Sequence, residues 1–405
     1  MRRITWVLLL LFAFAVPWEY SLDLGEPLGN IARILGLLML LAAIPAVFQS
    51  GRLRTPGAML WLSLAFYLWL CCSYLWSIEP LVTLTRISGF FQEMVVVWLI
   101  WEFAESAGDL RALMRAVVAG SWVLALLTLA NFATAQAVAD QIRFTAEGQD
   151  PNDVARFLDL AFPLAALLVN SERRWYWRLL AAGYLPLGFI AVLLTASRGG
   201  FLAAVAAMAG SGLLLAYGHP KRFLAGFLAL PLLAAVLWYI VPAGTIDRLA
   251  TIGEQIHSGD LNQRLNIWQA GLQAFVRAPY FGTGAGSFVA AARLAPIDTA
   301  HNTALSIAVA GGLVALFLAM AIVGSAIWSI SQTRDQLKWA LITALLVWAV
   351  TSLVATVEES RSTWLLLGMI ALAGRVAFDQ PRHTAACFST GMRRTLSGPI
   401  LQNGE

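Results

Sequence analysis

Residues 240–302 read IVPAGTIDRLATIGEQIHSGDLNQRLNIWQAGLQAFVRAPYFGTGAGSFVAAARLAPIDTAHN and form the one long polar interruption in a mostly apolar chain. A loop of this length inside a compact protein is usually either functional or disordered. Trp268, Leu272, Phe275 and Val276 recur in it at helical spacing, which argues against disorder. We therefore predict an ordered functional loop on one face of a membrane protein.

The composition of the chain excludes a soluble globular protein. Its mean hydropathy is +0.73, and 59% of its residues are hydrophobic while 12% are charged. Soluble domains carry about 25% charged residues. Apolar windows of roughly 17–25 residues mark membrane-spanning helices. We predict an all-α integral membrane protein with about twelve transmembrane helices, near residues 4–19, 30–49, 58–76, 86–103, 115–135, 154–170, 179–196, 201–217, 222–242, 302–330, 339–357 and 362–378.

Basic residues gather in alternate connections between these spans. One side holds Arg2, Arg3, Arg52, Arg54, Arg111, Arg115, Arg173, Arg174, Arg178, Lys221, Arg222, Arg334, Lys338 and the basic tail that begins at Arg375. Because positive residues stay cytoplasmic, we predict that both termini face the cytoplasm and that the long loop faces outward. This bias also accounts for the pI near 9.1, so the charge implies no nucleic-acid partner.

The domain organisation follows from the spans. We predict one polytopic membrane domain over residues 1–378, with the outward loop at 243–301, and a cytoplasmic tail over residues 379–405. The first span also resembles a cleaved signal peptide, because basic residues precede its apolar run and Ala13 and Ala15 suit a cleavage site. Both interpretations stay open, since cleavage leaves the topology of the other spans unchanged.

The sequence predicts neither a metal site nor a cofactor. Cys71, Cys72 and Cys387 form no metal-binding or disulfide pattern. No cluster of carboxylates offers a Mg²⁺ site.

Arg198 lies between two predicted spans, in Ser197-Arg198-Gly199-Gly200, with no polar loop around it. An arginine at the bilayer centre costs about 2.5–3.5 kcal/mol on insertion scales, so arginines at such depth usually have a partner or a task. No acidic residue neighbours Arg198 in sequence, and the glycines permit a close approach to it. We predict a functional role for its guanidinium.

Arg264 and His301 lie at two further predicted helix starts. Asn262 can cap a helix over about 263–277 that Pro279 ends, which places Arg264 in a first turn, where an anion is favoured. The apolar face of this helix, with Trp268 and Phe275, is expected on the bilayer surface.

Asp298 or Thr299 can cap the span that follows, which places His301 and Asn302 in its first turn. A helix N-terminus disfavours the protonated ring, so we predict a neutral His301 that is able to accept a proton.

Asn302 and four more outward residues are candidates for substrate binding. Arg86 near the start of a span either snorkels to the interface or binds an anion. Helix capping explains Asp150-Pro151 but leaves Arg156 without an explanation. Glu358, together with Arg361, belongs to a charged cluster that pairs with Arg198 or Arg264 or holds an acceptor.

Four stretches together resemble the O-antigen ligase and polymerase superfamily of bacterial inner-membrane glycosyltransferases. They are Leu75–Pro80 with Arg86, Asp150–Asp153, Ser197–Gly200, and a block with Arg264, Trp268, Pro279, Gly282, Gly284 and Phe288 that closes in His301-Asn302. Ligases resemble the chain best, since Gly312 follows the histidine motif. The second glycine position of that pattern holds Ala315, and Ser306 and Ala310 stand where the wider superfamily has acidic residues.

The resemblance implies a GT-C fold with its active site facing the periplasm. It implies a glycan on undecaprenyl diphosphate as donor and lipid A–core or another glycan as acceptor, in a membrane-lipid environment. Arg198 and Arg264 match the family's two arginines, and His301 matches its proposed base. Two guanidiniums can neutralise a diphosphate leaving group, so we expect no metal ion. The energy resides in the donor, so we expect no need for ATP. The acceptor attacks the face opposite the diphosphate, so we expect inversion at the anomeric carbon.

Three alternatives remain for the function. An O-antigen or exopolysaccharide polymerase and a protein O-oligosaccharyltransferase differ from a ligase only in their acceptor. A lipid-glycan flippase or transporter would line a midplane pathway with polar residues. The notable charges lie at the outer ends of the spans instead, which favours an enzyme.

Overall fold

The computed structural model describes residues 1–25, 29–134, 143–217, 241–253, 264–296 and 298–379, together with residues 221, 224, 228, 235 and 239. Every regular element in these ranges is a helix, and the single β-bridge joins Asp23 to Asn30. The prediction of an all-α protein is confirmed for this part of the chain. The predicted tail lies outside the described residues from residue 380 onward.

Ten helices in the described ranges are long and apolar enough to cross a membrane. They are α1 (Arg2–Ala15) with η1 (Val16–Ser21), α2 (Ile31–Ser50), α3 (Ala58–Cys72) with η2 (Ser73–Trp76), α4 (Pro80–Phe103), α5 (Ala107–Ala133), α6 (Pro151–Ser171), α7 (Trp175–Leu194), α8 (Arg198–Ala216), α14 (Thr303–Gln332) and α16 (Arg361–Asp379). The predicted span at 222–242 lies mostly outside the described residues. The span at 339–357 is helical as α15 (Asp335–Ser352), whose polar start, with Asp335 and Lys338, lowers its hydropathy. The count of about twelve stays a prediction.

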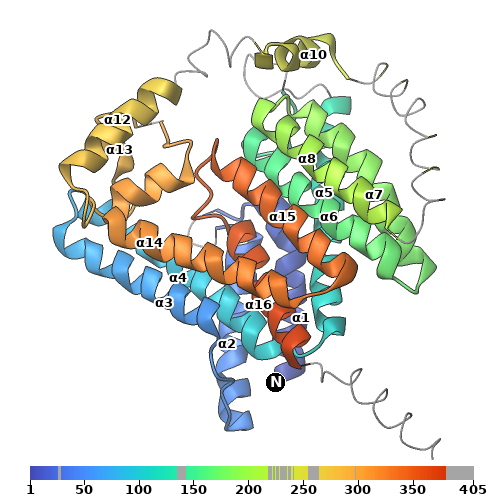
Figure 1. Cartoon of the computed structure of the whole chain (residues 1–405), viewed down its shortest axis with the longest axis horizontal. Helices are drawn as coiled ribbons and strands as arrows, with labels where there is room; N and C mark the ends of the chain where they lie inside the picture. The colour runs from blue at the N-terminus through green and yellow to red at the C-terminus, as the bar shows by residue number, and fades with distance from the viewer. Residues whose placement is uncertain are drawn as a thin grey trace, which may run out of the picture.

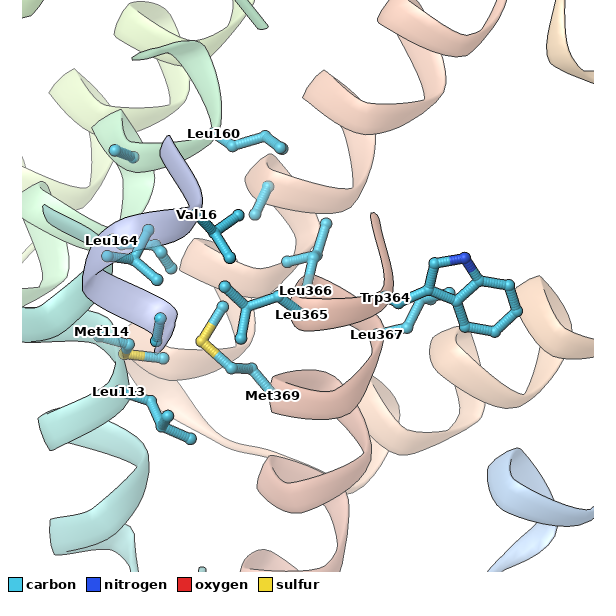
Figure 2. Close-up of a cluster of buried hydrophobic side chains, with 14 of the residues drawn as sticks. Val16, Leu113, Met114, Leu160, Leu164, Trp364, Leu365, Leu366, Leu367 and Met369 are labelled. Carbon is cyan, nitrogen blue, oxygen red and sulfur yellow. The ribbon is translucent and has the colours of Figure 1, made fainter. Parts of the chain in front are cut away.

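The packing core forms where α1, α5, α6 and α16 meet (Figure 2). Leu365 and Met369 of α16 lie beside Val16, and Leu113 of α5 and Leu164 of α6 line the same cluster. α6 and α16 are the two most buried of the candidate spans. The N-terminal ends of both helices, which carry polar residues, are therefore held by buried apolar contacts.

The end of the bundle that holds the N-terminus gathers the residues predicted to be cytoplasmic. Arg2 forms ion pairs with Glu102 at 3.3 Å and with Glu105 at 3.1 Å, and Arg115 pairs with Glu172 at 2.6 Å. The helices α10 (Ala243–Ala250) and α12 (Arg264–Arg277) lie at the opposite end (Figure 1). The helices therefore alternate in direction as the basic residues predict.

Helix α14 is broken at Gly312, where φ is 67° and ψ is −165°. The loop after α12 is bound to this break: Thr283 N donates to Val309 O at 2.9 Å, and Leu313 N donates to Pro279 O at 2.8 Å. A Cβ atom on Gly312 would lie 2.2 Å from the carbonyl oxygen of Tyr280. Only glycine fits there, since both the backbone angle and the space exclude a side chain.

A small second core fixes α12 above α14. Ile267, Gly271 and Ala274 are buried against α13 (Phe288–Ala292), and Trp268 and Phe275 pack onto the same cluster. Trp268 and Phe275 thus also pack within the protein, and their contact with the bilayer surface stays a prediction. Gly271 allows α12 to pack against α13, because a Cβ there would lie 2.8 Å from the ring of Phe288.

Candidate active site

Arg198 begins α8 directly after a strained turn. Ala196 adopts a left-handed φ of 49°, which is uncommon for a residue other than glycine. The Ser197 hydroxyl caps the helix by accepting from Gly200 N at 3.1 Å. Gly200 packs against α6, where an added Cβ would lie 2.3 Å from that of Ala155. The sequence pattern predicts that these glycines let another group approach Arg198. At Gly200 the close approach is instead the contact between α8 and α6.

Helix α10 holds the Arg198 side chain in place. Arg198 Nε donates to the carbonyl of Arg248 at 3.1 Å, and its Nη2 donates to the Thr251 hydroxyl at 2.6 Å. Arg248 Nε in turn donates to the carbonyl of Ala196 at 3.1 Å. These contacts orient the side chain of Arg198 through oxygens that carry no charge.

Asn152 joins the start of α6 to the same turn. Its Oδ1 accepts from Ser197 Oγ at 2.7 Å and from Arg143 Nη2 at 3.4 Å, while Arg143 Nε donates to the carbonyl of Thr195 at 3.0 Å. Asp150 caps α6, with its carboxylate accepting from Asn152 N at 2.8 Å. Two of the sequence motifs, at 150–153 and 197–200, are thus parts of one hydrogen-bonded structure.

Arg264 stands at the first described position of α12. Its guanidinium makes no direct hydrogen bond or ion pair with the described part of the chain. The indole of Trp268 donates to the carbonyl of Ala300 at 3.1 Å, and this bond holds the helix beside the segment that carries His301. Burial lowers the pKa of Arg264, Asp150 opposes this shift, and Arg198 adds to it.

His301 precedes α14 in a left-handed conformation, with φ of 46°. Asn302 is the cap of α14, since its Oδ1 accepts from Leu305 N at 2.9 Å. The prediction that Asp298 or Thr299 is the cap, with His301 and Asn302 in the first turn, is therefore wrong. The Asn302 amide nitrogen also donates to the carbonyl of Leu353 at 3.3 Å, so both ends of its side chain are used within the protein.

The imidazole of His301 is half-buried, and its Nδ1 lies 3.2 Å from the Thr299 hydroxyl. Burial lowers its pKa, and the positive charge of Arg264 lowers it further, whereas Asp150 and Asp298 act in the opposite direction. The direction of this shift is that of the neutral ring, but its cause is burial and Arg264, whereas the prediction from the sequence rests on the helix N-terminus.

Electrostatic interactions place these groups together. The pKa of Arg143 is lowered to about 10, first by burial and then by Arg248, with Arg198 and Arg264 also contributing. Burial and Arg198 likewise lower the pKa of Arg248. The carboxylate that opposes the shifts of Arg143, Arg264 and His301 is Asp150. Arg143, Arg198, Arg248 and Arg264 are thus linked by mutual repulsion, and Asp150 opposes it at Arg143 and Arg264, an arrangement that suits a polyanion such as a diphosphate.

Arg86, Arg156 and Glu358 lie outside this group. Arg86 forms an ion pair with Glu359, a partner that the sequence did not indicate. Arg156 is buried in α6 and pairs with Asp153 at 3.0 Å, while its Nη2 donates to Ser360 at 3.1 Å.

Burial raises the pKa of Glu358 to about 8, with a contribution from Glu359. Its Oε2 atom has no hydrogen-bond partner among the described residues.

Arg361 is held by three residues of other helices. It forms an ion pair with Glu19, donates to Gln92 Oε1 at 3.2 Å and lies 3.9 Å from Glu93. These contacts tie α16 to α4 and to the end of α1. Neither Arg198 nor Arg264 pairs with this cluster.

Sequence reasoning gave no role to Arg143 and Arg248. Their positions depend on folding of the 143–152 segment and of α10 onto the α7–α8 turn. The only local signal was the basic residues themselves. The described residues contain no group of three or more His, Cys, Asp or Glu side chains that could hold a metal ion.

Comparison with known proteins supports the resemblance of the motifs. Residues 183–320 match the model of the family described as O-Antigen ligase, a segment that contains Arg198, Arg264 and His301. Comparison with curated proteins gives no match. The chain is a multi-pass membrane protein that carries an O-antigen ligase family domain over residues 183–320, in agreement with the O-antigen ligase/polymerase superfamily.

Proposed function

We propose that this protein is an inner-membrane glycosyltransferase of GT-C type that transfers a glycan from undecaprenyl diphosphate to an acceptor sugar, and that it acts as an O-antigen ligase on lipid A–core. The observation that carries this proposal is that Arg264, on α12, interacts electrostatically both with Arg198 at the start of α8 and with His301 before α14. The match to the O-antigen ligase family supports the same conclusion.

The guanidiniums of Arg198 and Arg264 bind the diphosphate of the donor. As the bond between the anomeric carbon and the phosphate oxygen breaks, negative charge develops on the leaving group. Fixed guanidiniums stabilise that charge without having to reorganise. The contacts of Arg198 with Arg248 and Thr251 keep its side chain in one orientation before the donor arrives.

His301 accepts the proton of the acceptor hydroxyl. Its Nδ1 faces Thr299, which leaves Nε2 for the acceptor. The hydroxyl oxygen attacks the anomeric carbon from the face opposite the diphosphate, the proton passes to the imidazole, and undecaprenyl diphosphate leaves. This geometry inverts the configuration at the anomeric carbon.

The active site faces the periplasm in this proposal. The N-terminal end of the bundle, with Arg2, Arg54 and Arg115, is then cytoplasmic. The helices α10 and α12, at the other end, lie where the lipid-linked donor presents its glycan (Figure 1).

A deletion strain tests the function and separates it from its closest alternative. Loss of O-antigen from lipid A–core, with intact polymer retained on undecaprenyl diphosphate, identifies a ligase. Chains of a single repeat identify a polymerase and contradict the proposal.

Complementation with His301→Ala tests the mechanism. The variant is expected to insert and to bind donor but not to transfer the glycan. Full transfer by this variant would remove His301 as the base.

A further inference from the structure

The crevice between α1, α2 and α4 contains a cavity of about 390 Å³ that the proposed reaction does not use. Phe12, Gly36, Leu37, Phe91 and Val95 line its apolar walls. Its volume lies within the range of about 300–1,000 Å³ that is usual for small-molecule sites. All three helices are candidate membrane spans, so an apolar chain fits these walls better than water does.

Polar groups line one part of this cavity. Arg33, Gln92 and Arg361 are among its lining residues. The charge of Arg361 is compensated by Glu19, and its Nη2 donates to Gln92 Oε1, so the amide nitrogen of Gln92 is available as a donor. Neither this amide nitrogen nor the guanidinium of Arg33 has a hydrogen-bond partner among the described residues. The cavity therefore combines apolar walls with two unused donors, one of which is charged.

The backbone around Arg33 adds to the attraction for an anion. Arg33 lies in the first turn of α2, which Asn30 caps by accepting from Arg33 N at 3.0 Å. The positive charge of Arg33 is unfavourable at this end of the helix dipole. An anion bound there is stabilised both by the dipole and by the Arg33 guanidinium. An apolar slot with a guanidinium and an amide at its polar part matches a lipid: an acyl chain beside the walls and a phosphate at the donors.

We propose that this cavity binds one acyl chain of an anionic phospholipid of the surrounding bilayer, with its phosphate between Arg33 and Gln92. One guanidinium that has no ion-pair partner in the described ranges suits the single negative charge of a phosphodiester, and the volume suits a single chain. This site is independent of the transferase function proposed above.

Native mass spectrometry of the purified full-length protein tests the headgroup. Phosphatidylglycerol and phosphatidylethanolamine with identical acyl chains are added to the detergent-solubilised protein. We expect phosphatidylglycerol to bind about fivefold more tightly, which is the size expected of one exposed charge pair. The Arg33→Gln variant loses this preference, whereas Arg52→Gln, which changes an exposed arginine beyond the other end of α2, retains it.

A second variant tests the cavity itself. A Cβ on Gly36 would lie 3.9 Å from the ring of Phe12, which is an ordinary contact, so Gly36→Leu folds and fills the space. We expect it to lose bound phosphatidylglycerol. Gly324→Leu is the matched control, because a Cβ on Gly324 meets nothing within 4 Å.

Equal binding of the two phospholipids by the wild-type protein would overturn the proposal. So would retention of phosphatidylglycerol by both Arg33→Gln and Gly36→Leu. Displacement of phosphatidylglycerol by an equimolar amount of undecaprenyl phosphate would also overturn it, since the occupant would then be an isoprenoid lipid.

Discussion

Arg198 and Arg248 are joined by two hydrogen bonds between α10 and the start of α8: Arg198 Nε donates to the Arg248 carbonyl, and Arg248 Nε donates to the carbonyl of Ala196, two residues before Arg198, each at 3.1 Å. The pair fixes one of the two arginines proposed to bind the diphosphate. The closeness of the two guanidiniums also lowers the pKa of Arg248, after burial. Such a pair of like charges is held together by the backbone oxygens between them.

The Arg248→Lys variant is expected to lower kcat/KM for the donor by about tenfold, because a hydrogen bond to a charged group contributes about 1.5–3 kcal/mol. Lysine keeps the charge but lacks the planar fork that bonds Ala196 O. Steady-state kinetics with purified donor measures the effect. Arg293→Lys, at an exposed arginine that follows α13, serves as the control, and an equal loss there would contradict a specific role for Arg248.

The acid limb of the kcat/KM profile is expected below pH 6.5, the ordinary pKa of histidine, because burial and Arg264 lower the pKa of His301. A general base works when it is deprotonated, so activity rises as the pH rises through this pKa. Asp298 raises the pKa of His301, so Asp298→Asn shifts the limb to still lower pH. A limb that moves upward in this variant would argue against His301 as the titrating group.

Gly312→Ala is expected to destabilise the protein by at least about 1–3 kcal/mol, which is the cost of a strained backbone conformation. The new Cβ would also clash with the carbonyl of Tyr280 and push the 279–284 loop off α14. Thermal unfolding in detergent measures the change. Gly324→Ala, in the same helix with open space around it, is expected to keep the wild-type midpoint.

Glu19→Gln is expected to cost up to about 3–5 kcal/mol of unfolding free energy, because it leaves the buried charge of Arg361 with only the more distant carboxylate of Glu93, 3.9 Å away. The double variant Glu19→Gln/Arg361→Gln recovers part of the loss if the ion pair is its cause. Glu79→Gln changes an exposed carboxylate and is expected to leave the unfolding midpoint unchanged. Chemical denaturation followed by tryptophan fluorescence compares the three variants with the wild-type protein.

Transfer is expected to continue in the presence of EDTA, because guanidiniums supply the positive charge that a metal ion supplies in other enzymes. The assay follows glycan transfer to lipid A–core before and after dialysis against the chelator. Activity that is lost with EDTA and restored by Mg²⁺ would contradict the mechanism.

Much of the fold could be predicted from the sequence because long apolar runs have few alternatives in a membrane. The spans from α1 to α8 follow from hydropathy and from the alternation of basic residues. The break of α14 could not be predicted in the same way, since Gly312 lies in an uninterrupted apolar run. Its left-handed conformation depends on hydrogen bonds with a loop about thirty residues earlier, which no local pattern encodes.

In the candidate site, too, some features could be predicted from local sequence and others depend on tertiary contacts. A charge without a neighbour in sequence drew attention to Arg198, and a helix start drew attention to Arg264. The cap of α14 was misassigned, because Asp298, Thr299 and Asn302 are all good caps. What selects Asn302 is the left-handed backbone at His301, and only the tertiary packing of the preceding segment determines that conformation.

The excess of positive charge around Asp150 bears on the end of the catalytic cycle rather than its start. Arg143 is repelled by Arg198, Arg248 and Arg264, and an incoming diphosphate would relieve this repulsion. In the proposed reaction both phosphates remain on the departing lipid, which has gained negative charge when its sugar is gone. We therefore expect the spent carrier to bind more tightly than the fresh donor, so that its release into the bilayer, and not bond cleavage, limits turnover.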